Sequence, residues 1–115
     1  MGYVMQIEEL RKALQQGITV EYKAHCQKRM LERGITRADI IECIQKGEII
    51  EEYPLIDGNT SEKSFPACLV LGIEINAHKM LHVVVGYNTK KMIIISAYCP
   101  DDEHFEKDGK TRKGR

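Results

Sequence analysis

The chain has 115 residues, and its 17 Lys and Arg residues balance 17 Asp and Glu residues, so its net charge at pH 7 is zero. This length fits one domain, residues 1–115, that buries its own hydrophobic core without disulfides or a structural metal. Zero net charge argues against a protein that coats nucleic acid without specificity, and no apolar run approaches the roughly 18 residues of a membrane span. The start of the chain does not resemble a signal peptide, so we expect a cytoplasmic protein with no membrane contact.

The charges are unevenly distributed along the chain. Residues 23–37 and residues 107–115 each carry five cations against one acid, while residues 42–74 carry seven acids against two lysines. Such blocks are typical of a charged patch that faces an anionic partner, and equally of a solvated helix face followed by a frayed tail. We expect a domain core over about 20–105 and a mobile basic tail over 106–115.

Two amphipathic helices are predicted first. Apolar side chains recur at helical spacing over residues 6–16, before Gly17. A second helix is predicted over about 22–33, because Gly34 can adopt the left-handed backbone that ends helices.

The third helix has the clearest local signal in the sequence. Thr36 is a good N-cap residue, and Asp39 three positions later completes a capping box. Ile35 and Ile40 have the spacing of a hydrophobic staple, and Gly47 ends the pattern. We therefore expect a helix that begins after Thr36.

Four strands are predicted after the helices, because β-branched and apolar runs of strand length are joined by short connections. Their predicted ranges are 48–53, 68–75, 81–87 and 92–98. A polar loop over 54–66 contains a turn signal at 57–59. The order α-α-α-β-β-β-β predicts an α+β fold in which the N-terminal helices pack on a four-stranded antiparallel sheet.

The second predicted helix carries a histidine and two arginines on one face. His25, Arg29 and Arg33 fall within about a 100° arc, and Glu32 lies beside them. Unperturbed histidine exchanges protons near neutral pH, and the arginine guanidinium offers a fork of donors that fits phosphate. The same pattern also occurs on an ordinary solvated helix.

Two further candidates lie on the last two strands. His82 interrupts an otherwise apolar strand, and Tyr98 ends the next one. If the connection between these strands has an odd number of residues, the two side chains share a face of the sheet. If the number is even, Leu81 faces Tyr98 instead. The sequence alone leaves both registers open, and either residue could equally have a structural role.

The chain resembles the bacterial and archaeal family called domain of unknown function 4258. The resemblance begins with the segment His-Cys-Gln-Lys-Arg-Met-Leu-Glu-Arg-Gly-Ile-Thr at residues 25–36. Further matching segments occupy residues 39–40, 47–54, 69–72, 81–85, 95–101, 105 and 110–112. The loop over 54–66 is longer than is usual in the family, and Phe105 stands where a tryptophan is common.

The family looks like part of a superfamily that includes RelE-type and ParE-type toxins and barnase-like ribonucleases. The resemblance implies a RelE/ParE toxin-like fold and assigns five residues to family motif positions: His25, Arg29, Arg33, His82 and Tyr98. Many members of the superfamily cleave RNA without a metal.

Two functional hypotheses follow. The first is a metal-independent endoribonuclease that uses no cofactor, acts as the toxin of a toxin–antitoxin pair and has RNA and an antitoxin protein as partners. The second is a non-catalytic module that binds RNA or a protein. A metal site built from His25, Cys26, His82, Cys99 or His104 has no support from ligand spacing.

Overall fold

The computed structural model describes residues 5–53, 66–76, 78–88, 90–100 and 107–111. Over these residues the chain forms α1 (Ile7–Gln15), β1 (Thr19–Tyr22), α2 (Ala24–Arg33), α3 (Arg37–Lys46), β2 (Glu48–Tyr53), β3 (Ala67–Ile73), β4 (Met80–Asn88) and β5 (Lys91–Tyr98). The α+β class is confirmed, and each predicted helix and strand occurs within a few residues of its expected place. The predicted turn at 57–59, His104 and Phe105 lie outside the described residues.

The described strands form one mixed sheet of five strands in the order β1-β5-β4-β3-β2. The prediction of a four-stranded antiparallel sheet missed one strand, because β1 adds a fifth strand that runs parallel to β5. The second helix begins at Ala24, since Tyr22 belongs to β1 and pairs with Ile94. Four residues are too short a segment for a periodicity to identify, and parallel pairing needs a partner far along the chain.

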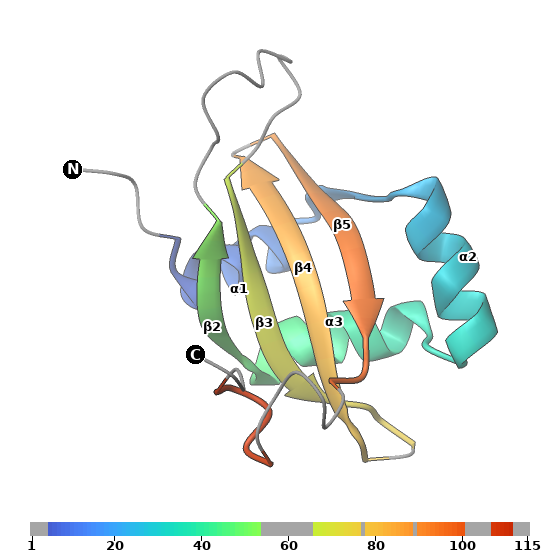
Figure 1. Ribbon diagram of the computed structural model, residues 1–115. Coiled ribbons are helices and arrows are strands. Elements are labelled where there is room, and N and C mark those ends of the chain that lie inside the picture. The colour runs from blue at the N-terminus through green and yellow to red at the C-terminus, as the bar shows by residue number, and fades with distance from the viewer. Residues whose placement is uncertain (1–4, 54–65, 77, 89, 101–106, 112–115) are drawn as a thin grey trace.

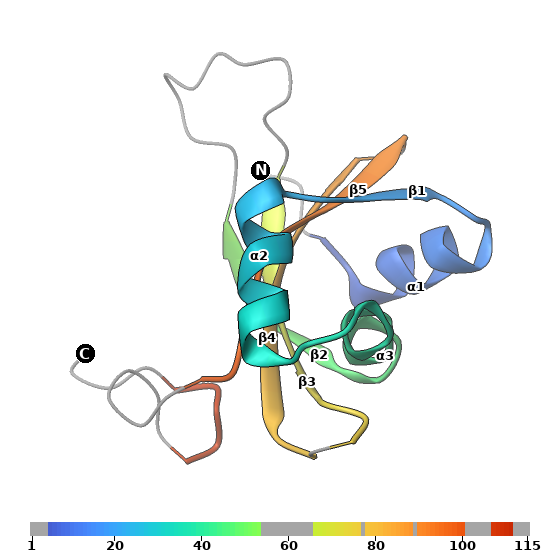
Figure 2. The same cartoon turned by 90° about the vertical axis from the view of Figure 1, so that its right-hand side faces the viewer.

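The helices occupy two different positions around the sheet (Figures 1 and 2). α1 and α3 cover one face, whereas α2 follows β1 and stands beside the end of β5 that β1 leaves unpaired, which we call the β5 edge. The described residues 107–111 lie on the opposite face. One face of the sheet is thus covered by α1 and α3, with α2 beside it, and the described C-terminal residues lie on the other face.

The helix ends follow the local signals. Gly34 adopts a left-handed conformation with φ of 71° after the last residue of α2. At the start of α3 the capping box is confirmed, since the Asp39 N–H donates to Thr36 Oγ1 at 3.1 Å and the Thr36 N–H donates to Asp39 Oδ2 at 2.9 Å. Asp39 Oδ1 also accepts from the Ile75 N–H at 2.9 Å. The carboxylate of Asp39 therefore ties α3 to the residues that follow β3.

The protonation of Asp39 is controlled by these contacts. Burial alone would raise the pKa of this carboxyl, but the hydrogen bonds from Thr36 and Ile75 outweigh burial and hold the pKa below its ordinary value. The side chain is buried, so removing it leaves two backbone donors without their acceptor.

We expect Asp39→Ala to lower the free energy of unfolding by about 2 kcal/mol at pH 7, because the variant loses a capping box and a tertiary hydrogen bond. Since the folded-state pKa is depressed, this contribution is present above the unfolded-state pKa and is lost as the pH falls through the folded-state value. Urea unfolding at neutral and acid pH checks both points, with Thr36→Ser as a control that keeps the hydroxyl acceptor. Equal stability of wild type and Asp39→Ala at pH 7 would contradict this assignment.

Candidate functional site

His82 and Tyr98 are direct cross-strand partners on β4 and β5. Their ring centroids are 5.3 Å apart, and the rings meet edge to face with an interplanar angle of 63°. The neighbouring residues Leu81 and Val83 belong to the core beneath α1 and α3, so strand alternation places His82 on the opposite face. The structure therefore joins these two candidate residues.

A β-bulge produces this pairing. β4 ends at Asn88 and β5 begins at Lys91, so the connection has two residues, an even number, which in a regular register would set Leu81 opposite Tyr98. The register shifts by one between the pairs Val84–Ser96 and Val85–Ile94, and Ile95 is the extra residue on β5. The bulge turns His82 and Tyr98 onto the same face.

His82 is fully buried, with a relative exposure of 0%. Its Nε2 lies 2.7 Å from the carbonyl oxygen of Gly109, and because a carbonyl can only accept, Nε2 carries the proton in this contact. Gly109 lies in the C-terminal region that we expected to be mobile, and it is itself buried. The sequence analysis missed this contact, although Asp108-Gly109 is a turn signal that indicates local structure in the tail.

The three candidate residues of α2 are exposed at the β5 edge of the sheet. Of these, Arg33 makes a direct link to β5, since its Nη1–H donates to the Ala97 carbonyl at 2.9 Å, next to Tyr98. His25 and Arg29 precede Arg33 by two turns and one turn of the helix. The buried side of α2 carries Cys26 and Met30, so Arg33 stands at the border between the buried and exposed sides.

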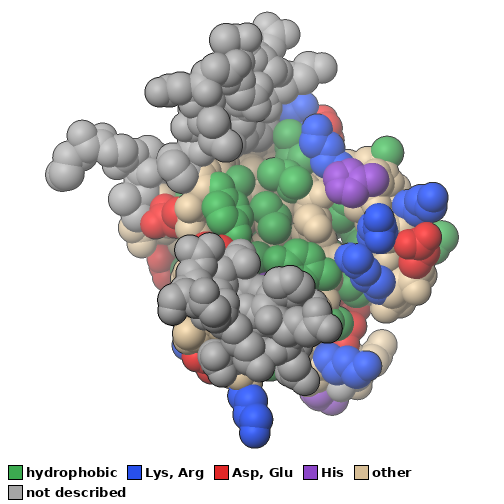
Figure 3. Space-filling view, in the orientation of Figure 1, with side chains coloured by type: hydrophobic (Ala, Val, Ile, Leu, Met, Phe, Trp, Pro, Cys, Tyr) green, Lys and Arg blue, Asp and Glu red, His purple; other side chains and the backbone are tan. Residues whose placement is uncertain are grey.

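The face of the sheet opposite α1 and α3 has two kinds of surface (Figure 3). Hydrophobic side chains cover the middle of the sheet, and Lys, Arg and His side chains gather beside them over α2. A guanidinium-rich helix next to an apolar surface can hold phosphates along the helix while bases contact the sheet. The basic side chains of α2 thus stand beside the face of the sheet on which strand alternation places His82 and Tyr98.

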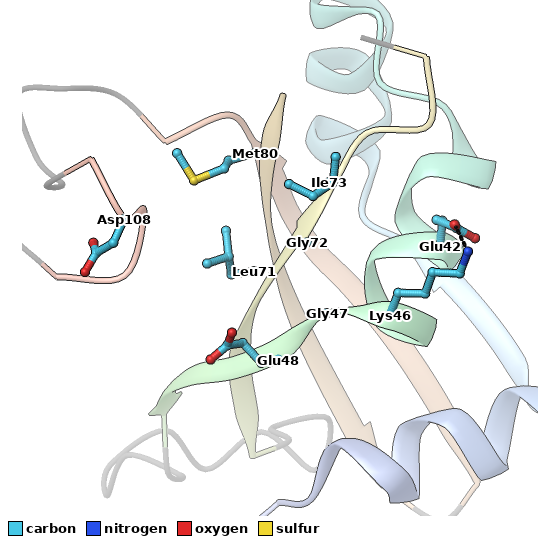
Figure 4. Close-up of a pocket in the computed structure, with 9 residues that line it drawn as sticks. All are labelled: Glu42, Lys46, Gly47, Glu48, Leu71, Gly72, Ile73, Met80 and Asp108. Atoms are coloured by element: carbon cyan, nitrogen blue, oxygen red, sulfur yellow. Dashed lines mark ion pairs between the residues drawn. The ribbon is translucent and has the colours of Figure 1, made fainter. Parts of the chain in front are cut away.

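A pocket of about 440 Å³ lies between the start of β2 and Asp108 (Figure 4), and its lining residue Leu71 is the cross-strand partner of His82 on β3. Its apolar lining comes mainly from Leu71, Ile73 and Met80, and its charged residues are Glu42, Lys46, Glu48 and Asp108. The single lysine of that lining pairs with Glu42 at 2.9 Å. Its acidic character is unsuited to phosphate, so we do not place the nucleic-acid site there.

The cysteines are free thiols, and Cys99 is the exposed one. Burial raises the pKa of Cys43 and of Cys68 to about 12, which makes both thiols poor nucleophiles at neutral pH. Within the described residues, no group of three or more His, Cys, Asp and Glu side chains is arranged to hold a metal ion. In that same part of the chain, no helix combines the length and apolarity needed to cross a membrane.

The family model described as Domain of unknown function (DUF4258) matches residues 22–99, which is more than half of the chain, and the protein belongs to this family. All five candidate residues fall inside the match, whereas α1 and residues 107–111 fall outside it. No curated protein matches the chain. No solved structure matches it either.

The contact between Arg33 and Ala97 predicts a difference between the two arginines of α2. We expect Arg33→Ala to lower the free energy of unfolding by about 1 kcal/mol, because a charge-assisted hydrogen bond to β5 is lost. The matched variant Arg29→Ala should stay within about 0.5 kcal/mol of wild type, since Arg29 is exposed. Urea unfolding of both variants checks this, and an equal loss in the two would contradict the structural role of Arg33.

Proposed function

We propose that this protein is a metal-independent endoribonuclease that binds RNA along α2 and β5 and cleaves it near the end of β5. The observation that carries the proposal is the pairing of His82 with Tyr98 on the strand that α2 borders. The phenol of Tyr98 lies on the strand beside the guanidinium groups of α2, and the imidazole of His82, which can transfer a proton, lies one strand further away. This combination is what phosphodiester cleavage by proton transfer requires.

The chemistry needs no cofactor. The 2′-oxygen of the RNA attacks the adjacent phosphorus, the new P–O2′ bond forms, and the P–O5′ bond breaks, which leaves a cyclic phosphate and a free 5′-hydroxyl. One imidazole accepts the 2′-hydroxyl proton and another protonates the leaving 5′-oxygen; His25 and His82 are our candidates for this pair. Arg29 and Arg33 stabilise the charge that builds on the phosphate, and Tyr98 orients His82.

The resemblance to RelE-type and ParE-type toxins and barnase-like ribonucleases supports the same reaction class. In this proposal the helices and sheet form a RelE-like fold, and the cellular partner is an antitoxin protein that covers the RNA-binding surface in the cytoplasm. The basic side chains over α2 supply the charge that an acidic antitoxin segment or an RNA backbone would meet.

Cleavage of RNA in the presence of a chelator tests the proposal. We expect defined products that disappear when the cleaved nucleotide carries hydrogen in place of its 2′-hydroxyl, because the nucleophile is then missing. Arg29→Ala should slow cleavage by about 10²–10³-fold with little loss of stability, since removing one donor to a developing charge has an effect of this size. His25→Ala should abolish the products. Lys12→Ala, an exposed cation of α1, is the matched control; undiminished cleavage by Arg29→Ala would overturn the site.

A second candidate function is a non-catalytic RNA-binding module, and the complete burial of His82 favours it. An imidazole without solvent contact is typical of a structural residue that completes the packing of a sheet end. In this case the basic face of α2 holds RNA, and no bond is broken.

For the binding module, we expect affinity for single-stranded RNA to fall steeply with salt. The slope of log affinity against log salt concentration should be about −0.7 for each phosphate neutralised, and Arg29→Ala should reduce its size by about 0.7. Fluorescence anisotropy with a labelled oligonucleotide measures both slopes. Salt-dependent binding without cleavage products would favour the module, whereas salt-independent binding would contradict both candidate functions.

A further inference from the structure

We propose that residues 107–111 form an autoinhibitory strap, which covers His82 in the free protein and is displaced when RNA binds along α2 and β5. The inference deepens the proposed function and rests on it, because it states how the site of that function is closed. The strap lies on the face of the sheet opposite α1 and α3 and outside the part of the chain that the family model matches.

The strap occupies the position that a substrate would need. The Gly109 carbonyl lies 2.7 Å from His82 Nε2, and His82 has no exposed surface. While this hydrogen bond persists, Nε2 can neither accept a proton from RNA nor donate one to it. The free protein with its strap docked therefore holds one of the two proposed catalytic imidazoles out of reach.

The close approach of the strap depends on glycine at position 109. Gly109 has φ of +72°, a conformation that residues with a side chain adopt poorly. A Cβ atom at this position would lie 2.5 Å from Met80 Sδ and 3.5 Å from Leu71 Cδ1. Any larger residue is therefore strained in its backbone and also displaces the Met80 side chain, so this position offers a way to release the strap without a substitution in the sheet.

The strap has its own internal structure. The Asp108 carboxylate accepts hydrogen bonds from the Lys110 N–H at 2.8 Å, the Thr111 N–H at 3.0 Å and the Thr111 hydroxyl at 2.9 Å. These bonds form a tight turn that presents the Gly109 carbonyl to the sheet. The turn is formed by the strap's own residues, so it can leave and return to the surface as a unit.

The attachment of the strap is weak enough to be reversed. Its five residues, Lys107 to Thr111, include no apolar side chain, so the strap buries no hydrophobic side chain of its own, although Gly109 lies against the side chains of Met80 and Leu71. Outside the His82 contact, Lys110 pairs with Glu48 at 3.2 Å, and both side chains are about half exposed. Exposed ion pairs contribute little and are screened by salt. Segments with few apolar contacts open locally while the core stays folded.

The charge of the strap indicates what displaces it. Lys107 and Lys110 outnumber Asp108, and Lys110 is held by an acidic side chain of β2. The phosphates of RNA compete with Glu48 for Lys110. Once the strap is released, they also pair with Lys107. Binding of a polyanion and opening of His82 are thereby coupled.

The test compares the accessibility of two histidines in the full chain. Diethyl pyrocarbonate acylates accessible imidazoles, and peptide mass spectrometry gives the rate at each; exposed His25 serves as the internal reference. We expect His82 to react far more slowly than His25 in the wild-type protein. In Gly109→Val the acylation rate of His82 should rise about tenfold or more. This follows if the strap is open in at most about a tenth of the wild-type molecules and in most molecules of the variant. Lys107→Ala, in the same segment, should leave the rate unchanged.

Activity provides the second measurement. Gly109→Val should raise kcat/KM for RNA cleavage by about the same factor as the His82 acylation rate, because both follow the open population. Asp108→Ala, which removes the acceptor of the turn, should shift both quantities in the same direction, and thermal melting confirms that each variant is folded.

The outcomes separate this inference from the proposed function. If His82 stays unreactive in both folded variants, or becomes reactive without a gain in cleavage by an active protein, the strap is not autoinhibitory and the inference is overturned. If no form cleaves RNA, the ribonuclease proposal fails, and the strap is then tested by the affinity for a 2′-deoxy oligonucleotide. Tighter binding by Gly109→Val than by the wild type supports the strap, and equal binding overturns it.

Discussion

The close approach of α3 to β3 is the constraint on which the helix-covered side of the molecule depends. Gly72 lies directly beneath Cys43, and a Cβ atom at position 72 would come within 2.6 Å of the Cys43 sulfur. The Cys43 thiol also reaches the carbonyls of Val70 and Leu81, at 3.8 and 3.7 Å. Because a small residue faces a small residue here, the helix lies close against two central strands and the apolar side chains around it close the core.

This packing decides where functional groups can lie. With α1 and α3 on one face, the side chains of His82 and Tyr98 are left to the other face, and the exposed side chains of α2 are left to the β5 edge. α2 contributes Cys26 and Met30 to the same core as the other helices, but it stands beside β5, the strand that carries Tyr98. The arrangement brings basic side chains of the first half of the chain to a strand formed by the last third.

The burial of His82 is central to the functional interpretation. A histidine covered by protein atoms is the expected result of structural packing, yet the atoms that cover it include a five-residue polar segment with no apolar side chain. A permanent core contact normally includes hydrophobic burial. We propose from the polar chemistry of the covering segment that this contact opens, which reconciles an inaccessible imidazole with the proposed catalytic role.

The sequence by itself determined the local structure: the capping box of Thr36 and Asp39, the helix end at Gly34 and the positions of β2 to β5 all follow from neighbouring residues. It also indicated the basic face of α2, because helical spacing alone sets that arc. Only the tertiary structure decided the parallel pairing of β1, the bulge at Ile95 that sets His82 against Tyr98, and the contact of Gly109 with His82. Each of these contacts joins residues that are far apart in the sequence and depends on the packing of the whole sheet, so no local sequence pattern predicts it.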